Sequence, residues 1–482
     1  MPEQKKKTKS PVLQKRPAPL LYFGARLYLK IANRLQYNLH ASGEKVKGPA
    51  LLISNHTSNA DYKFIASAVK PARISFLGTY HWFTFKKLAF WLKRIGAIPK
   101  YQFTTDLEAM KKIRYVIRDK KGVVYIAPEG TVYASGHLGY ISPAIAKMVK
   151  FLKVPVYASK IQGAGLGNAK WSAKPHKGLV HIDTHLILSA EEVQTLSKEQ
   201  ILERIITSLS YNEFNFQKRF NVRVPGPDKA LGFETMFYKC PVCHSEFTLS
   251  TSGNNITCSC CGFTATIQDD FTFKWTAGAG SSTAAGTARD AGSSIAAGAD
   301  AGAESSPAAG ADAGAESSIA AGAARDGVAG VDSPAADTAH VDSAPAGAHF
   351  FENYSQWYDW QLDEMKKEVS NPNFKLSEEV EYGYDEPGVD NYVKVGKGIM
   401  TLTHNGWDYV GTFKDEQVCE HDDPQAVFLA TLKVGLHFEL PYRFGRCRVF
   451  YPKNGLHSMK WHLASLAMSL HLADQNHSDP QQ

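Results

Sequence analysis

Short β-rich runs alternate with helical stretches between about Ala50 and Tyr211, and this alternation constrains the fold more than any other feature of the chain. Five runs have the apolar, β-branched character of strands, and three segments have helical periodicity. The strand runs are PALLISN, RISFLG, GVVYIAPEG, VPVYASKIQG and GLVHIDTHLIL, and the helical segments are Thr105 to Asp119, Ser142 to Leu152 and Ala190 to Leu209. The pattern predicts an α/β fold with a largely parallel sheet flanked by helices.

The chain has 482 residues, which is too long for one ordinary core, and changes in composition indicate where its domains and linkers lie. The chain begins with a lysine-rich tail. After Trp275 the sequence consists mostly of Ala, Gly, Ser and Asp, and such a segment cannot bury enough apolar surface to offset the entropy lost on ordering. We therefore expect a basic disordered tail at 1–17, the α/β domain at 18–232, a small cysteine-bearing module at 233–276, a disordered Ala/Gly-rich linker at 277–348 and a β-rich C-terminal domain at 349–482.

The C-terminal domain has the signals of antiparallel strands followed by one helix. GIMTLTHNGWDYVGTF predicts a hairpin about Asn405-Gly406, HFELPYRFGRCRVFYP predicts another, and LHSMKWHLASLAMSLHLA predicts a closing helix. This order resembles a pleckstrin-homology-like barrel, a likeness of pattern that says little about function.

Charge is distributed unevenly along the chain. Residues 1–230 hold 38 Lys and Arg against 14 Asp and Glu, whereas residues 231–482 hold 16 against 33. A basic half suits an anionic membrane surface, a phosphorylated substrate or nucleic acid. The acidic half carries the cysteine module, which has no basic cluster of its own, so we do not expect nucleic acid as a partner.

Two aromatic and basic segments favour the surface of a membrane. In PLLYFGARLYLKIANRLQYN the cations Arg26, Lys30 and Arg34 form one stripe, and most of the remaining circumference is apolar. The alternative is a first helix that packs on its own domain. HWFTFKKLAFWLKRIG has the same character, but no stretch is long enough and apolar enough to span a bilayer. With no signal-peptide pattern, we expect a cytoplasmic protein peripheral on the inner face of the membrane.

The stretch LLISNHTSNADY places His56 and Asp61 five residues apart, directly behind a buried-strand run. Thr57 to Asn59 are good helix caps, so the pair should flank the start of a helix. There Asp61 can accept the Nδ1 proton of His56 and leave Nε2 as a base toward a hydroxyl. The alternative is that both are only polar residues at a helix start.

A second polar site follows another strand run. VVYIAPEGTVYASG ends in Glu129, Gly130 and Thr131, which places a carboxylate and a tight turn at the carboxyl end of a parallel strand, where ligands bind in α/β sheets. Because a lone buried Glu is unfavourable, we expect Glu129 at the rim.

These two sites together resemble those of the glycerolipid acyltransferase family, which includes the lysophosphatidic acid acyltransferases. NHTSNAD matches the family block NHxxxxD, PEGT its EGT block, IGAIPK its Gly-x-Ile-Pro block and KVPVYAS its Val-Pro block, in the family's order. The resemblance covers roughly Leu20 to Tyr211. It implies transfer of an acyl group from acyl coenzyme A or acyl carrier protein to a lysophospholipid such as lysophosphatidic acid, as in phospholipid biosynthesis, without a redox cofactor.

The same resemblance assigns roles to residues of this chain. His56 becomes the general base and Asp61 its orienting partner; backbone N–H groups near the helix start become the oxyanion donors. Acceptor binding falls to Asn55, Lys100, Glu129, Gly130 and Thr131, and the acyl-side wall to Pro155. Two arginines that family members use for the glycerol phosphate are replaced by Val132 and Gln102, so Lys100 or Lys160 would supply the charge, or the acceptor has another head group.

Four cysteines have the spacing of a zinc ribbon. Cys240, Cys243, Cys258 and Cys261 form C-x2-C-x14-C-x2-C, a set of four protein ligands that implies structural zinc. Cys260 leaves open which thiol of the second pair binds, and the alternative is free or disulfide-bonded thiols.

The reading that these features favour is a membrane-surface O-acyltransferase. The alternative is a non-catalytic lipid- or protein-binding adaptor built on an acyltransferase fold, for which the loss of the two arginines is the best support.

Overall fold

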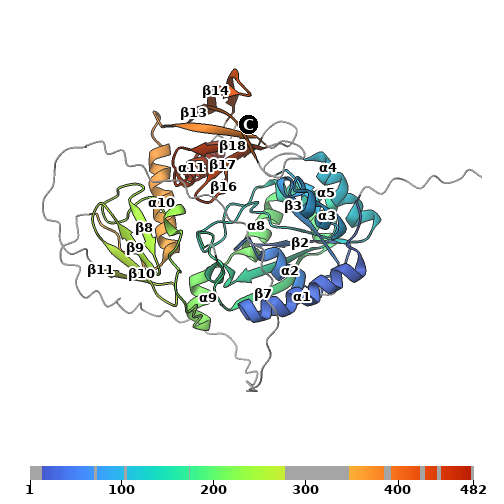
Figure 1. The fold of residues 1–482 in the computed structure, drawn as a ribbon. Helices are drawn as coiled ribbons and strands as arrows, with labels where there is room; N and C mark the ends of the chain where they lie inside the picture. Colours follow the sequence, from blue (N-terminus) through green and yellow to red (C-terminus); the bar gives the residue numbers. More distant parts are fainter. Residues whose placement is uncertain are drawn as a thin grey trace, which may run out of the picture.

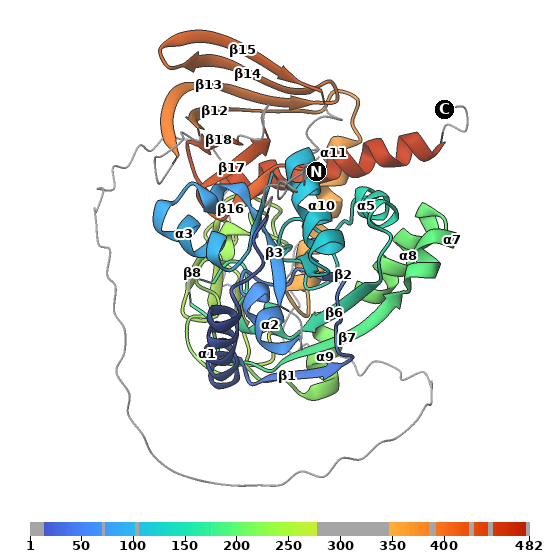
Figure 2. The same cartoon turned by 90° about the vertical axis from the view of Figure 1, so that its right-hand side faces the viewer.

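The computed structural model describes residues 14–69, 73–101, 106–172, 174–276, 347–384, 392–423, 429–441 and 447–478. Most of the predicted tail at 1–17 and linker at 277–348 lies outside these residues, as does Gln102. Three sheets organise the described part of the chain, and the C-terminal sheet lies over both the α/β domain and the small sheet (Figures 1 and 2).

The first sheet has seven strands in the order β1-β7-β6-β2-β5-β3-β4. Their bounds are β1 Leu39–Gly43, β2 Ala50–Ser54, β3 Ile74–Thr79, β4 Ile98–Lys100, β5 Val123–Ile126, β6 Val156–Gln162 and β7 Val180–Leu188. All neighbours pair in parallel except β6 and β7, which are antiparallel, so the sheet is mixed but mostly parallel. All five predicted strand runs are confirmed, whereas β1 and β4 were not predicted.

Helices cover both faces of this sheet. They are α1 Pro19–Tyr37, α2 Asp61–Ala68, α3 Lys86–Arg94, α4 Leu107–Arg114, α5 Ala144–Leu152, α6 Ala164–Gly167, α7 Ala190–Thr195, α8 Lys198–Leu209 and α9 Glu213–Phe220, with a 3-10 turn η1 Tyr80–Phe83 and a π turn η2 Tyr115–Asp119. Alternate strand residues enter separate cores, so that Leu52 of β2 packs with α1 and α2 while Leu51 packs with α4, α5 and α8. The helix predicted at Ala190 to Leu209 is two helices, because Ser197 begins the second with a capping box.

The second and third sheets are antiparallel. The small sheet has the order β11-β10-β9-β8, with β8 Leu249–Ser252, β9 Asn255–Cys258, β10 Thr264–Ile267 and β11 Phe273–Thr276, after the turn η3 Phe233–Thr235. The C-terminal sheet has the order β15-β14-β13-β12-β18-β17-β16, with β12 Lys375–Tyr384, β13 Val393–Thr403, β14 Gly406–Phe413, β15 Glu416–Asp422, β16 Thr431–Lys433, β17 His437–Pro441 and β18 Cys447–Pro452. Both predicted hairpins and the closing helix, α11 His457–Ser478, are confirmed.

Helix α10, Tyr354–Val369, was not predicted. It packs between the α/β domain, the small sheet and the C-terminal sheet. Its Trp357 is fully buried, lies 5.9 Å from the ring of Trp275 and donates its indole N–H to the carbonyl of Lys239 at 3.1 Å. One continuous core extends from Trp171 of the α/β domain through these rings to Trp461 of α11. The C-terminal part is therefore packed against the domain that carries the candidate site. Within the described residues, no helix is both long and apolar enough to cross a bilayer.

Candidate active site

His56 and Asp61 form a hydrogen-bonded pair at the carboxyl end of β2. The Nδ1 atom of His56 lies 2.9 Å from Oδ2 of Asp61, whose side chain is 1% exposed while that of His56 is 26% exposed. The tautomer that donates Nδ1–H to the carboxylate leaves Nε2 as the acceptor. The pair thus has the geometry of a general base with an orienting partner.

Asp61 is fixed by the residues that precede its helix. Its carboxylate accepts hydrogen bonds from the N–H of Thr57 at 2.7 Å, the hydroxyl of Thr57 at 3.0 Å, and both the N–H and the hydroxyl of Ser58 at 3.1 and 3.0 Å. The expectation that Thr57 to Asn59 cap α2 is wrong, because the N-cap is Ala60, which makes no side-chain cap. The N–H groups of His56, Thr57 and Ser58 all donate to carboxylates, so these three do not form the expected oxyanion donors.

Glu129 joins this pair from the neighbouring strand β5. Its carboxylate accepts the N–H of His56 at 2.6 Å and that of Gly139 at 2.8 Å. The expected rim position is wrong: Glu129 is only 2% exposed, and the two N–H donors satisfy its oxygens. Burial raises the pKa of Glu129 to about 7, although these donors lower it. Gly130 turns the chain at φ +71°, which favours glycine.

Asn55 lies beside His56 with its amide turned to the sheet. The side-chain N–H donates to the carbonyl of Ile161 at 2.7 Å, and the side-chain oxygen accepts the N–H of Ile161 at 2.7 Å. Asn55 therefore ties the chain directly before His56 to β6. Thr131 is buried directly after Gly130.

Lys100 and Pro155 are separated from this centre. Lys100 ends β4, three strand positions from β2, where its ammonium donates to the carbonyl of Tyr101 at 2.8 Å and burial lowers its pKa. Pro155 precedes β6, and its carbonyl accepts the N–H of Leu51 at the amino end of β2. His56 follows the carboxyl end of β2, whereas Pro155 lies at the amino ends of β2 and β6. The two residues are therefore at opposite ends of these strands.

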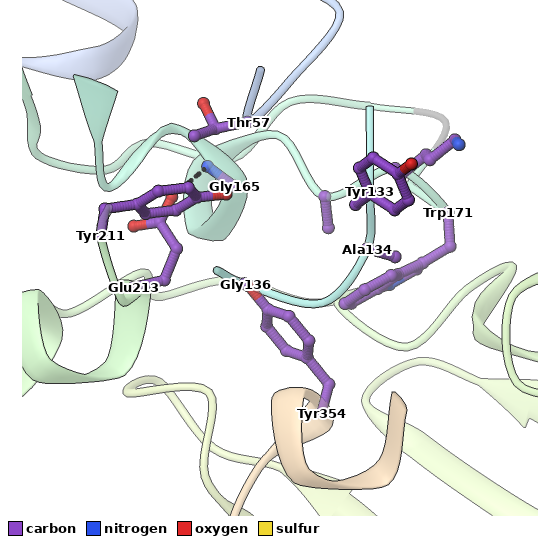
Figure 3. A pocket seen from close by; sticks show the side chains of 11 residues that line it. Thr57, Tyr133, Ala134, Gly136, Gly165, Trp171, Tyr211, Glu213 and Tyr354 are labelled. Atoms are coloured by element: carbon purple, nitrogen blue, oxygen red, sulfur yellow. Dashed lines mark hydrogen bonds between the residues drawn. The ribbon is translucent and has the colours of Figure 1, made fainter. Parts of the chain in front are cut away.

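A second buried carboxylate was missed by the sequence reading. Glu213, at the start of α9, accepts the N–H groups of Gly163 at 2.5 Å and Gly165 at 3.0 Å, and burial raises its pKa to about 7. It lines a cavity with Thr57, Tyr211 and Tyr354 (Figure 3) that has room for about one water molecule, about 10 Å³. The glycine-rich run QGAGLG, whose N–H groups can hold an anion, was the available signal.

A partly buried cation also lies beside the segment after Glu129. The ammonium of Lys170 donates to the carbonyl of Val132 at 2.5 Å, and burial lowers the pKa of Lys170 to about 8. Val132 occupies the position at which the family resemblance led us to expect an arginine. A lysine distant in sequence thus brings a cation to the neighbourhood of that position.

The four predicted cysteines converge in the small sheet. Their Sγ atoms all lie within 4.8 Å of one another, and the Cys240–Cys261 and Cys243–Cys258 pairs are 3.8 Å apart. Four thiolates about 2.3 Å from a central zinc would be separated by about this distance, and a disulfide would bring sulfurs to about 2.05 Å. Cys260 is exposed and lies outside the group, so the set fits one tetrahedral metal ion.

A protein-family model covers the candidate site. Residues 32–162, which include His56, Asp61 and Glu129, match the family model described as Acyltransferase. A crystal structure of a 1-acyl-sn-glycerophosphate acyltransferase from Thermotoga maritima is 16% identical, covers 40% of this chain and 79% of its own, and has a TM-score of 0.34. No curated protein matches the chain. The family match supports an acyltransferase as the class of protein defined by this site.

Proposed function

We propose that the protein transfers a fatty acyl group from an acyl thioester to the hydroxyl of a lysophospholipid at a membrane surface. The observation that carries the proposal is the His56–Asp61 pair, in which Asp61 is fully buried and satisfied while His56 remains partly exposed. Among the described residues no side chain or carbonyl bonds to Nε2 of His56, so this atom is available to an acceptor hydroxyl.

In the proposed reaction, Nε2 takes the proton of the acceptor hydroxyl as its oxygen bonds to the thioester carbonyl carbon. Asp61 stabilises the imidazolium that forms. Collapse of the tetrahedral intermediate breaks the carbon–sulfur bond, and the leaving thiolate takes the proton back from His56. The products are an ester and a free thiol, and no enzyme nucleophile is required.

Acceptor binding is proposed for the segment that begins at Glu129. Glu129 and Gly130 form the turn next to His56, and the ammonium of Lys170 donates to the carbonyl of Val132. A partly buried ammonium favours an acceptor with a negative head group, such as the phosphate of lysophosphatidic acid.

Membrane docking is proposed for α1 and α3. One face of α1 packs on the domain, where Asn33 donates to the carbonyl of Lys63, but Leu20, Leu27, Ile31 and Leu35 are 55–91% exposed on the other. Helix α3 meets the start of α1 through the N–H of Ala18 and the carbonyl of Arg94 and exposes Phe90 and Trp91. Exposed apolar residues bordered by cations suit the headgroup region of an anionic bilayer.

The remaining parts are proposed to be structural. Cys240, Cys243, Cys258 and Cys261 would hold zinc, which with four protein ligands stabilises the small module and takes no part in transfer. A pleckstrin-homology-like assignment for the C-terminal domain is supported by seven antiparallel strands followed by α11.

The test is release of free thiol from acyl coenzyme A and acyl carrier protein donors, with vesicles and a panel of lysolipid acceptors. His56→Ala should lower turnover by at least about a hundredfold with vesicle binding intact, because general base catalysis contributes about that much. Asp61→Asn should reduce it less if Asp61 only orients the ring. Near-normal turnover in His56→Ala would reject the base assignment, and no turnover from folded wild-type protein would leave the adaptor as the better reading.

A further inference from the structure

A large groove lies over β6 and β7 and has no role in the proposed chemistry. Its volume is about 480 Å³, within the range of small-molecule sites. Its floor consists of every second residue of the two strands, among them Lys160 and Gln162 of β6 and His181 and Asp183 of β7. Its wall comes from Ser208 at the end of α8 and from the last turn of α9.

The charged groups of the groove favour an anion. Lys160 and Arg219 line it, and neither forms an ion pair among the described residues, although Lys160 lies opposite Asp183 in the β6–β7 register and the Arg219 guanidinium lies 5.3 Å from the centre of the Phe220 ring. The one carboxylate of the lining, Asp183, is already bound by His185 at 2.6 Å and by the hydroxyl of Ser42 at 2.7 Å. A guanidinium and an ammonium that line one hollow are groups that proteins use to bind phosphate.

An exposed aromatic ring lies beside these cations. Phe220, the last residue of α9, lines the groove, and its side chain is 48% exposed. Its ring centre lies 6.5 Å from that of His181. An apolar ring next to phosphate-binding cations suits a ligand with both a flat base and a phosphate, because bases stack on aromatic side chains.

The groove and the site cavity are lined by neighbouring residues of the same chain segments. Gln162 lines the groove, and the next residue, Gly163, donates its N–H to Glu213 of the site cavity. Ser208 lines the groove, and Tyr211, three residues later, lines that cavity. A ligand held here would therefore be bound by chain segments that continue into the site cavity.

We propose that the groove binds the phosphorylated adenosine end of coenzyme A, with Lys160 and Arg219 on phosphate and Phe220 against the purine. The proposal rests on the proposed function, since it assigns a position to one of the two candidate donors. The pantetheine arm, which carries no nucleotide, would then extend from the groove toward His56. An acyl group carried by acyl carrier protein would be delivered without binding in this groove.

The first experiment measures binding without turnover. Adenosine 3′,5′-bisphosphate is titrated into the full-length chain by calorimetry, for wild type and for Lys160→Gln, Arg219→Gln and Phe220→Ala. Each variant should weaken binding about tenfold, the effect of losing one charge-assisted hydrogen bond or one stacked ring. Lys198→Gln and Phe151→Ala, which alter an exposed cation and an exposed ring outside the groove, should bind as wild type does. Equal binding in all variants with unchanged melting temperatures would overturn the proposal.

The second experiment compares acyl coenzyme A with acyl pantetheine, which lacks the nucleotide. The groove variants should raise KM about tenfold for acyl coenzyme A, leave its kcat unchanged and leave both constants unchanged for acyl pantetheine. Equal shifts for both donors, or a shift only with acyl carrier protein, would reject the nucleotide site. If wild-type protein binds the bisphosphate in the groove but transfers no acyl group, the proposed function fails while the binding site stands.

Discussion

Main-chain N–H groups hold every carboxylate of the candidate site. Asp61 is bound by Thr57 and Ser58, Glu129 by His56 and Gly139, and Glu213 by Gly163 and Gly165. A buried carboxylate with such donors can remain ionised, but burial makes its charge unfavourable. For Glu129 and Glu213 burial prevails, since their pKa values are raised to about 7.

This shift predicts a pH dependence of stability. The pKa of Glu213 is raised from an ordinary value of 4.5 to about 7, so its contribution to stability is complete below about pH 4.5 and is lost as the pH rises through 7. Relative to Glu213→Gln, wild type should therefore lose up to about 3 kcal/mol of unfolding free energy over this range. Denaturant unfolding at several pH values measures the difference. Glu203→Gln, an exposed change on α8, should show no such trend, and a flat difference for Glu213→Gln would contradict the shift.

At the scale of elements, the loop after β5 is held from outside its own domain. His137 of this loop pairs with Asp359 of α10 at 2.7 Å, and Tyr354 of α10 lies against Gly136. Burial alone would lower the pKa of His137, but Asp359 raises it above its ordinary value. Since Gly139 of the same loop bonds to Glu129, α10 supports the part of the candidate site that contains Glu129.

Asp359→Asn should therefore raise KM for the lysolipid acceptor about two- to fivefold, the effect of losing one partly exposed ion pair. The donor KM should not change. Asp363→Asn, on the same helix and paired only with Lys366 in the described residues, is the matched control. Equal acceptor KM values in the two variants would show that α10 does not position the loop.

The cysteine group makes a separate prediction for the small sheet. Cys240→Ser should release about one zinc per chain and increase hydrogen exchange across residues 233–276, because the metal supplies folding free energy to so small a module. Cys260→Ser, whose sulfur lies outside the group, should retain the metal. Mass spectrometry measures the metal content of each variant. Zinc retained in Cys240→Ser would reject the assignment of Cys240 as a ligand.

At the scale of the whole molecule, helix α1 lies on one side of the first sheet and α8 on the other (Figure 2). The exposed apolar residues of α1 include Leu27 and Ile31. Replacing Leu27 and Ile31 by Gln should weaken binding to anionic vesicles at least about tenfold, because both side chains would leave the bilayer. Ile206→Gln, an exposed change on α8, should bind as wild type does. Sedimentation with vesicles measures this, and equal binding of all three proteins would exclude α1 as the docking surface.

Sequence reasoning performed unevenly within the site itself. The His56–Asp61 pair was predicted because both residues lie within one strand-to-helix connection. The burial of Glu129 was not, because its donor Gly139 comes from a loop that α10 supports. Glu213 was missed since its partners lie about fifty residues earlier. Pro155 was assigned from a motif, and a motif does not say at which edge of the sheet its strand begins.

By itself, the sequence determined strands β2, β3, β5, β6 and β7 of the first domain, the His56–Asp61 pair and the four-cysteine group, because each of these signals is contained in a few neighbouring residues or a fixed spacing. Only the tertiary structure decided that β6 and β7 are antiparallel, that α10 packs against the active-site loop, and that Lys160, Arg219 and Phe220 share one groove. These features depend on contacts between residues far apart in the chain. Each such contact is the outcome of many small packing energies, which no local pattern records.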